Sequence, residues 1–285
     1  MILVTGATGH VGRALVDELT ATSTPLRALT RTPPRAGFPP RVETAEGDLS
    51  RTDALRAAME GVESLFLVLP DGQLPAEVLP TVRRAGVRRV VLVSSLLAQT
   101  HPSSVIGAAM LTAETAVRES GLDWTLLRPW EFASNTLAWA SQIRGGDTVR
   151  LPAAGLASPV IHPADIAAVA ARALTEDGHE ARVYPLTGPE ALTVEQKVTA
   201  IGTALGRELH VEVHADPQPA DHVARQDQGA VTEDPMIPGV ATQESPGVLP
   251  TVEEVTGNPA RGFHLWATEN SDAFGPRTCP SANDA

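Results

Sequence analysis

The sequence has one cysteine, one tyrosine, one lysine and only 4% aromatic residues. Cys279 has no second thiol in the chain with which to form a disulfide, and no potential metal ligands surround it at a suitable spacing. A fold held together by internal disulfides is therefore excluded, and we expect the chain to bind no metal.

Runs of basic residues and long hydrophobic runs are also absent. The formal net charge is −12, and no run of lysine or arginine occurs, which argues against a surface for nucleic acid or anionic membranes. No apolar stretch reaches the roughly 18 residues that a membrane-spanning helix needs. The chain begins directly with an apolar strand, so no signal peptide is expected. These absences predict a cytoplasmic protein, a monomer or homodimer, that binds neither nucleic acid nor membranes.

Against these absences, the first residues contain a glycine-rich turn. Ile2–Val4 form an apolar run typical of a short buried strand, and from His10 onward apolar residues recur every fourth position, as on a helix face. Gly6, Gly9 and Gly12 lie between them, where a missing Cβ permits tight turning and close approach to a pyrophosphate. Because the start of the helix supplies free N–H groups, this pattern predicts a dinucleotide site.

The residues after the second predicted strand favour NADP over NAD. The strand at Leu26–Leu29 runs into Thr30–Arg35, which contains no acidic residue, whereas NAD-binding chains place one here for the ribose hydroxyls. Arg31 can hold a 2′-phosphate through two parallel hydrogen bonds, with Arg35 as a second charge nearby. The alternative is a solvated loop arginine without a ligand. We predict NADP(H) as the cofactor.

Predicted strands and helices alternate along the chain. Strands are expected at residues 2–4, 26–29, 64–69, 89–93, 124–127 and 183–186, and helices from residue 10 and at 51–61, 75–85, 108–120, 163–174 and 194–205. This alternation predicts an α/β fold in which helices cover both faces of a doubly wound parallel sheet. Ligands bind such sheets at the carboxyl ends of the strands.

The strand ends complete the predicted cofactor site. Asp48 and Leu49 would border the adenine, and Leu69 and Pro70 the ribose and pyrophosphate. Pro129 and the residues after it would approach the nicotinamide. The predicted cofactor-binding residues are Gly6, Thr8, Gly9, His10, Val11, Gly12, Arg31, Arg35, Asp48, Leu49, Leu69, Pro70, Ser94 and Pro129.

Proline becomes frequent after His214, and the pattern of alternating elements ends there. Residues 215–259 are expected to form an irregular lid over the substrate or a partly disordered arm. Helical segments are expected near residues 251–255 and 263–267, and residues 275–285 are expected to be a disordered tail.

Several short motifs resemble those of the NmrA-like branch of the atypical short-chain dehydrogenases/reductases. They are TGATGHVG at the N-terminus, GDLS at 47–50, VSS at 93–95, SGLDWTLLRP at 120–129 and LTGPEALT at 186–193. The resemblance covers residues 1–210 and 250–267. It implies an NADP-binding Rossmann-type domain at 1–150, with its core continuing through 158–186, and a smaller substrate-binding or lid region at 187–274. Members of the branch are reductases or cofactor-sensing regulators.

The chain departs from the wider family at the usual catalytic acid. Short-chain reductases usually protonate the new alkoxide with a Tyr-x-x-x-Lys pair, and the matching positions here are Ile106 and Met110. The only tyrosine, Tyr184, and the only lysine, Lys197, lie outside that helix. Either catalysis is lost and the chain is an NADP(H)-sensing regulator that binds a protein partner, or hydride transfer continues with a proton from the substrate or water.

We favour the enzyme, and the resemblance extends to reductases of this branch that act on polycyclic aromatic polyketides. The expected reaction is NADPH-dependent reduction of one ketone of an angucyclinone-type substrate in antibiotic biosynthesis, with a proton from a neighbouring phenol or water. Ser95 is the catalytic candidate, either polarising the carbonyl or bonding a ribose hydroxyl. His162 either shapes the pocket or caps a helix with Asp165. The candidate substrate contacts are Leu96, His101, Trp130, Phe132, Asn135, Trp139 and His162, with core packing as the alternative for the aromatic residues.

Overall fold

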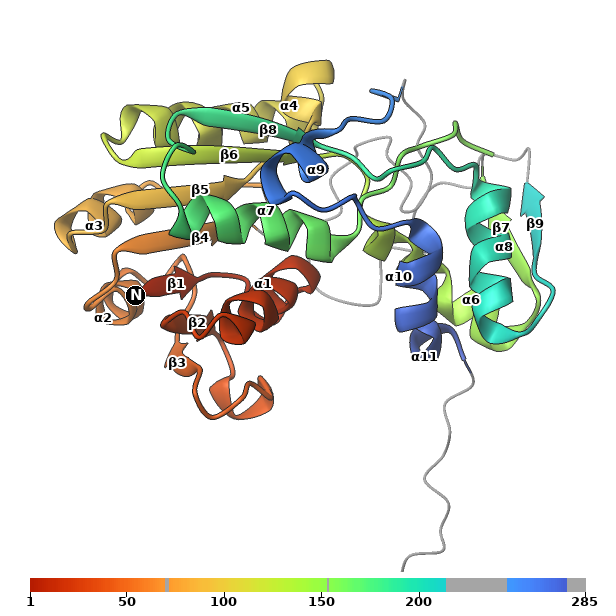
Figure 1. The fold of residues 1–285 in the computed structure, drawn as a ribbon, viewed down its shortest axis with the longest axis horizontal. Coiled ribbons are helices and arrows are strands. Elements are labelled where there is room, and N and C mark those ends of the chain that lie inside the picture. Colours follow the sequence, from red (N-terminus) through yellow and green to blue (C-terminus); the bar gives the residue numbers. More distant parts are fainter. Residues whose placement is uncertain (70–71, 153, 214–244, 276–285) are drawn as a thin grey trace, which may run out of the picture.

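The computed structural model describes residues 1–69, 72–152, 154–213 and 245–275. Its centre is a parallel seven-stranded sheet in the order β3-β2-β1-β4-β5-β6-β8 (Figure 1). The strands are β1 (Ile2–Val4), β2 (Leu26–Thr30), β3 (Glu43–Glu46), β4 (Ser64–Val68), β5 (Arg89–Val93), β6 (Asp123–Pro129) and β8 (Arg182–Leu186). The predicted doubly wound parallel sheet is confirmed.

The central strands are buried on both faces. In the register of β1 and β4, Val4 lies opposite Phe66, and neither side chain is exposed. This two-sided burial explains why the central strands read as continuous apolar runs in the sequence. The edge strand β3 has the sequence ETAE and is mostly exposed, so it lacks the apolar pattern by which a strand can be predicted from sequence.

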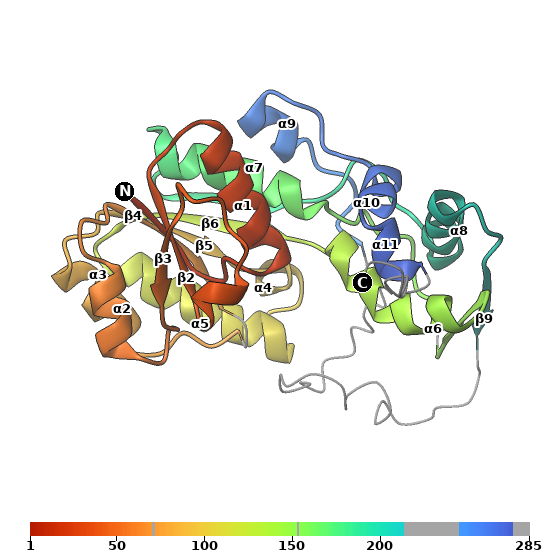
Figure 2. The same cartoon turned by 90° about the horizontal axis from the view of Figure 1, so that it is seen from below.

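Helices cover both faces of the sheet (Figures 1 and 2). On one face lie α1 (His10–Ala21), α7 (Pro163–Thr175) and α9 (Thr251–Thr256), and their apolar side chains share a core with the strands. On the other face lie α2 (Thr52–Ala58), α3 (Val78–Arg84) and α5 (Val105–Glu119), over a second core. Three residues separate the short helix α4 (Leu97–Thr100) from the end of β5. Parallel connections require this arrangement, because each crossover places a helix on a face.

A smaller lobe lies beyond the carboxyl ends of the strands (Figure 1). Its elements are a 3-10 helix (Ala133–Trp139), α6 (Ala140–Gly145), β7 (Thr148–Leu151), α8 (Val194–Leu205), β9 (His210–Val213), α10 (Phe263–Glu269) and α11 (Ser271–Phe274). Its core combines aliphatic side chains with an aromatic cluster, in which the ring of Trp266 is centred 5.5 Å from that of Phe263 and 6.0 Å from that of Phe274. Residues 133–150, which the sequence analysis placed with the larger domain, pack in this lobe because β7 pairs with β9.

The C-terminal part is described only in segments. Residues 214–244, which make up most of the expected lid, lie outside the described residues, and so does the expected tail apart from Gly275. The two helical segments expected in this part are present as α9 and α10. Within the described ranges, no helix is both long and apolar enough to cross a membrane.

Candidate active site

The glycine-rich turn between β1 and α1 has a geometry that only glycine allows. Gly6 has a φ of +59°, in the left-handed region that residues with a side chain rarely adopt. A Cβ on Gly12 would lie 2.1 Å from the carbonyl oxygen of Gly6, which is far inside van der Waals contact. The N–H of Gly9 donates to that same carbonyl at 2.9 Å. The turn is therefore held closed by its own backbone.

The N-terminus of α1 is open to a ligand. Ser104, His162 and Thr193 cap the other three described helices of twelve or more residues with their side chains, whereas no side chain caps α1 at Gly9. Uncapped N–H groups at a helix N-terminus bind phosphate well. The uncapped turn thus fits the pyrophosphate of a dinucleotide.

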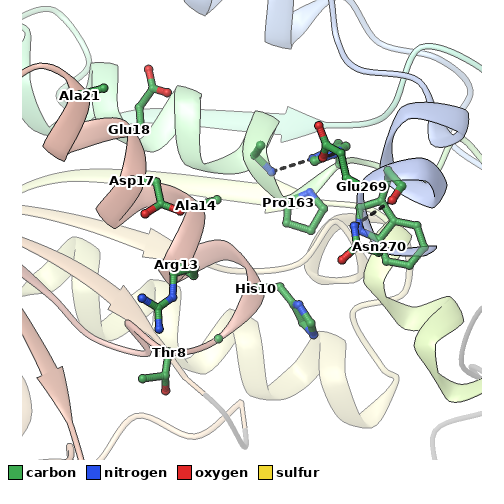
Figure 3. A pocket seen from close by; sticks show the side chains of 14 residues that line it. Thr8, His10, Arg13, Ala14, Asp17, Glu18, Ala21, Pro163, Glu269 and Asn270 are labelled. Carbon is green, nitrogen blue, oxygen red and sulfur yellow. Dashed lines mark hydrogen bonds and ion pairs between the residues drawn. The ribbon is translucent and has the colours of Figure 1, made fainter. Parts of the chain in front are cut away.

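The turn opens onto a groove of about 610 Å³ between α1, the start of α7 and the end of α10 (Figure 3). Thr8, Gly9 and His10 line it, and burial lowers the pKa of the His10 imidazole. The predicted contact Val11 differs, because its side chain is buried in the core under α1 and only its main chain faces the turn.

The two arginines expected to bind the 2′-phosphate lie where the sequence predicts. Arg31 follows β2 directly and Arg35 closes the 3-10 helix Pro33–Arg35, and both side chains are exposed. Neither guanidinium forms an ion pair with another described residue. Both remain available for a phosphate.

The remaining predicted cofactor contacts, at the ends of the next strands, differ in how far their side chains are exposed and bonded. Asp48 Oδ1 accepts hydrogen bonds from the hydroxyl and N–H of Ser50 at 2.6 and 2.8 Å, and these bonds lower the pKa of the Asp48 carboxyl. Leu49 packs partly against the sheet core, and Leu69 is buried. Pro70 lies outside the described residues.

Ser94 is turned away from the predicted cofactor site. Its buried hydroxyl donates to Glu114 Oε1 at 2.6 Å, which leaves only its main chain for a cofactor. Glu114 also accepts from Arg128 Nε at 2.8 Å and Nη2 at 2.6 Å. Burial by itself would raise the pKa of the Glu114 carboxyl, but the hydrogen bonds from Arg128 and Ser94 outweigh it and lower that pKa. This network locks α5 to the ends of β5 and β6.

Ser95, the catalytic candidate, follows as a half-buried residue at the start of α4. Its hydroxyl oxygen accepts the N–H of Leu97 at 3.2 Å, which holds the side chain at the strand end. His101, at the end of α4, pairs through Nδ1 with the hydroxyl of Thr100 at 2.9 Å. The main-chain N–H of Leu96, the residue after Ser95, donates to Pro129 O at 2.9 Å, which places this segment beside the end of β6.

Apolar side chains occupy the two positions at which the wider family has its catalytic tyrosine and lysine. Ile106 packs against Leu96, Leu97 and Trp130, and Met110 is buried in the same helix α5. No acidic or basic side chain occupies either position. The proton that a Tyr-x-x-x-Lys pair supplies in the wider family therefore cannot come from these two positions.

Three of the predicted substrate contacts are core residues. Trp130 is only 5% exposed and its indole N–H donates to the Ser158 hydroxyl at 3.0 Å, while Trp139 lies in the core of the smaller lobe. Leu96 is buried beside Trp130. For Trp130 and Trp139 the structure therefore favours core packing, the alternative that the sequence analysis left open, and Leu96 offers no exposed surface to a ligand. Phe132 and Asn135 are half-buried after β6 and are still candidates.

His162 caps a helix. Its Nδ1 accepts the N–H of Ala164 at 3.0 Å at the start of α7, and its Nε2 lies 3.1 Å from Glu269 Oε2 in α10. Burial lowers the pKa of His162 despite the nearby carboxylates. The carboxylate of Asp165, one turn further along α7, accepts hydrogen bonds from the main-chain N–H of Arg261 at 2.7 Å and from the Arg261 guanidinium at 2.5 Å. These pairs join α7 to α10 and to the segment that leads into it, and His162 lines the groove.

The sequence analysis missed a buried ion pair behind the strand end. Lys197 in α8 donates to both oxygens of Glu131, which directly follows Trp130. The sequence does hint at this pair, since Lys197 lies among Val194, Val198 and Ile201 on the apolar face of that helix. A lone lysine on such a face needs a buried partner, but its identity could not be read from the sequence.

The family is shown by comparison with known proteins. Residues 6–177 match the model of a family described as NAD(P)H-binding. The chain is 38% identical over 284 residues to the (4-alkanoyl-5-oxo-2,5-dihydrofuran-3-yl)methyl phosphate reductase of Streptomyces griseus, covering 97% of this chain and 100% of that protein. It is 33% identical over 284 residues to the NAD(P)H azoreductase of Xenophilus azovorans, covering 96% and 99%.

Solved structures agree with this assignment. The NADPH-dependent quinone oxidoreductase of Escherichia coli superposes with a TM-score of 0.73 at 25% identity, over 94% of this chain and 99% of that chain. The triphenylmethane reductase of Citrobacter sp. shares the fold, with a TM-score of 0.74 at 18% identity over 95% and 98%. The chain therefore belongs to the NAD(P)H-binding family of oxidoreductases, of the atypical short-chain dehydrogenase/reductase type.

Proposed function

We propose that this protein transfers hydride from NADPH to a conjugated, electron-poor acceptor. The observation that carries the proposal is the apolar packing of Ile106 and Met110 where a catalytic tyrosine and lysine would stand. A reductase without that acid can still work if the acceptor stabilises the charge that hydride transfer creates, because positioning supplies much of the barrier reduction.

The names of the relatives support an acceptor of this class. The relatives are named as reductases of a 5-oxo-2,5-dihydrofuran, of azo compounds and of quinones. In each of these acceptors a conjugated oxygen or nitrogen can receive the electron pair displaced by hydride. Such acceptors need only a weak proton source once the hydride has arrived.

Within this class, we propose a ketone of a polycyclic aromatic polyketide of the angucyclinone type as the substrate, in antibiotic biosynthesis. A phenol beside the carbonyl polarises it through a hydrogen bond and can release the proton that the new alkoxide takes up. Bound NADPH supplies the hydride. Ser95 is the side chain at the end of β5 that would orient the carbonyl, and Phe132 and Asn135 would border the ring system.

We further propose that the cofactor is NADPH rather than NADH. The exposed Arg31 and Arg35 follow β2, and no acidic residue stands there to accept the hydroxyls of an unphosphorylated ribose. The alternative of an NADP(H)-sensing regulator is less well supported, since relatives that match almost the full chain are named reductases. A cytoplasmic location and a monomeric or homodimeric state stay predictions.

The test is an activity panel with purified protein and NADPH. Quinones, an aromatic polyketide ketone with a neighbouring phenol, its methyl ether and an isolated aliphatic ketone are compared by loss of absorbance at the nicotinamide band, and products are identified by mass spectrometry. We expect turnover of the conjugated acceptors, slower turnover of the methyl ether and none of the aliphatic ketone. Equal turnover of the aliphatic ketone, or no turnover of any acceptor, would contradict the proposal.

A further inference from the structure

The loop that carries the two exposed arginines has few contacts of its own. Between β2 and β3, Arg35 N donates to Thr32 O and Ala36 N to Pro33 O, both at 3.1 Å, and these bonds close only the single 3-10 turn. Bonds of this span do not fix the direction in which the turn leaves the sheet. The loop is therefore placed by contacts outside the turn: the buried side chain of Ala36, the packing of Phe38 against the sheet core, and one polar contact.

That contact comes from Arg13 in the first turn of α1. Its Nη2 donates to the carbonyl of Ala36, and its Nη1 donates to the carbonyl of Gly37 at 3.4 Å. Its guanidinium carbon lies 4.1 Å from the ring centroid of Phe38, within cation–π range. One side chain thus grips three consecutive residues at the end of the loop.

Arg13 is itself held by the glycine-rich turn. It directly follows Gly12, and its main-chain N–H donates to Gly9 O at 2.8 Å. Figure 3 shows its side chain extending from α1 beside Thr8 and away from Glu269. Arg13 therefore joins the turn that fits the pyrophosphate to the loop that carries Arg31 and Arg35.

We propose that Arg13 is a positioning residue for cofactor selection, which holds the Arg31–Phe38 loop in the conformation that receives the 2′-phosphate of NADPH. The inference rests on the proposed choice of NADPH. Two of its nitrogen atoms already donate to carbonyls, so Arg13 acts through the loop. A lysine cannot replace it, because one ammonium group cannot donate to two carbonyls and stack flat on a ring in the same geometry.

The physical effect is preorganisation. When Arg13 is absent, the loop must be ordered at the moment the phosphate binds, and that ordering lowers affinity. NADH gains nothing from the two loop arginines, so its affinity is unaffected. Loss of Arg13 should therefore reduce the preference for the phosphorylated nucleotide rather than dinucleotide binding in general.

The experiment measures nucleotide binding to the full chain by calorimetry, with adenosine 2′,5′-bisphosphate and adenosine 5′-monophosphate as probes. Arg13→Met should weaken the binding of the bisphosphate by about tenfold, the loss of affinity expected for about 1.4 kcal/mol of ordering. The affinity for the monophosphate should stay within about twofold of the wild-type value. Arg13→Lys should recover little of this loss. Arg31→Ala combined with Arg13→Met should be scarcely weaker than Arg31→Ala alone, since both changes disable the same contact.

Arg27→Met is the matched control. Arg27 makes similar multiple bonds, to Glu43 and to the carbonyls of Ala58 and Glu60, but at the opposite end of β2. It should lower thermal stability without changing the ratio of the two nucleotide affinities. If Arg13→Met does not fold, Phe38→Leu removes the ring half of the grip and should lower the same ratio by a smaller factor.

Three results would overturn the inference. Arg13→Met could weaken both probes equally, which indicates a merely structural role, or its loss could add fully to that of Arg31→Ala, which indicates direct phosphate contact. A wild-type chain that binds both probes equally would overturn the choice of NADPH as well. Reduction of conjugated acceptors is measured separately, so failure there is distinguishable from failure here.

Discussion

Lys197 Nζ lies 2.9 and 3.0 Å from the two carboxylate oxygens of Glu131, and both side chains are at most 1% exposed. Burial lowers the pKa of the Lys197 ammonium, while the carboxylate opposes that shift. The pair joins α8 of the smaller lobe to the chain leaving β6. It thereby holds the residues after Pro129, including Phe132, in place beside the candidate active site.

Removing one partner of this pair should be strongly destabilising. Lys197→Met leaves the Glu131 carboxylate buried without its cation, for which a loss of about 3–5 kcal/mol is typical. Lys197→Met combined with Glu131→Leu should recover most of that loss, because the uncompensated charge is gone. Urea unfolding midpoints of the wild type and variants check this. A double variant as unstable as Lys197→Met would contradict it.

The Glu114 network should make stability fall in acid. Because the pKa of Glu114 is lowered in the folded protein, the unfolded chain binds the proton more readily, and stability rises with pH across the interval between the two values. The contribution is complete above the unfolded value of about 4.3 and is lost as pH falls toward the folded one. Unfolding midpoints of the wild type and Glu114→Gln should differ most at neutral pH and converge in acid. A constant difference would contradict this assignment.

His162 should cause a second loss of stability on acidification, and this loss should begin at a higher pH than the loss caused by Glu114. Burial lowers the pKa of His162 in the folded state, and protonation of Nδ1 would also break the hydrogen bond that it accepts from the N–H of Ala164. Stability is then complete above the unfolded value of about 6.5 and falls as pH drops below it. His162→Asn keeps a side chain that can cap α7 but does not titrate. Its unfolding midpoint should change less than that of the wild type between neutral and mildly acidic pH, and an equal change would refute the role of His162.

Arg31→Ala should separate the two nicotinamide cofactors. Loss of a charge-assisted contact to the 2′-phosphate costs about 1.5–3 kcal/mol, whereas NADH has no phosphate at that position. Dissociation constants from fluorescence titration should therefore rise roughly tenfold or more for NADPH and little for NADH. Equal losses for both, or a wild-type preference for NADH, would show that Arg31 does not bind the phosphate.

Ser95→Ala and His101→Ala should each slow turnover only modestly. If the substrate phenol or water supplies the proton, neither variant should approach the roughly 10²–10⁴-fold loss typical of a dedicated acid–base group. Single-turnover rates at saturating NADPH measure the effect, with cofactor affinity as the control. A 10⁴-fold loss in either variant with unchanged cofactor binding would identify a protein donor.

Local patterns in the sequence determined the glycine-rich turn, most of the strands and the long helices. Gly12 can be predicted because a Cβ would collide with a residue six positions earlier, and the apolar runs of β4 and β5 because both faces are buried. The missing tyrosine and lysine are likewise visible in composition alone. In each case the physical constraint acts within a few residues, or within one element.

Only the tertiary structure decided which of these residues face a ligand. The tryptophans after β6 have the same composition signal whether they stack on a substrate or fill a core, and burial of Trp130 and Trp139 depends on segments far along the chain. The pairing of Lys197 with Glu131 and the grip of Arg13 on Ala36 join residues separated by 66 and 23 positions. Such contacts arise from the way whole elements pack, and no local periodicity encodes them.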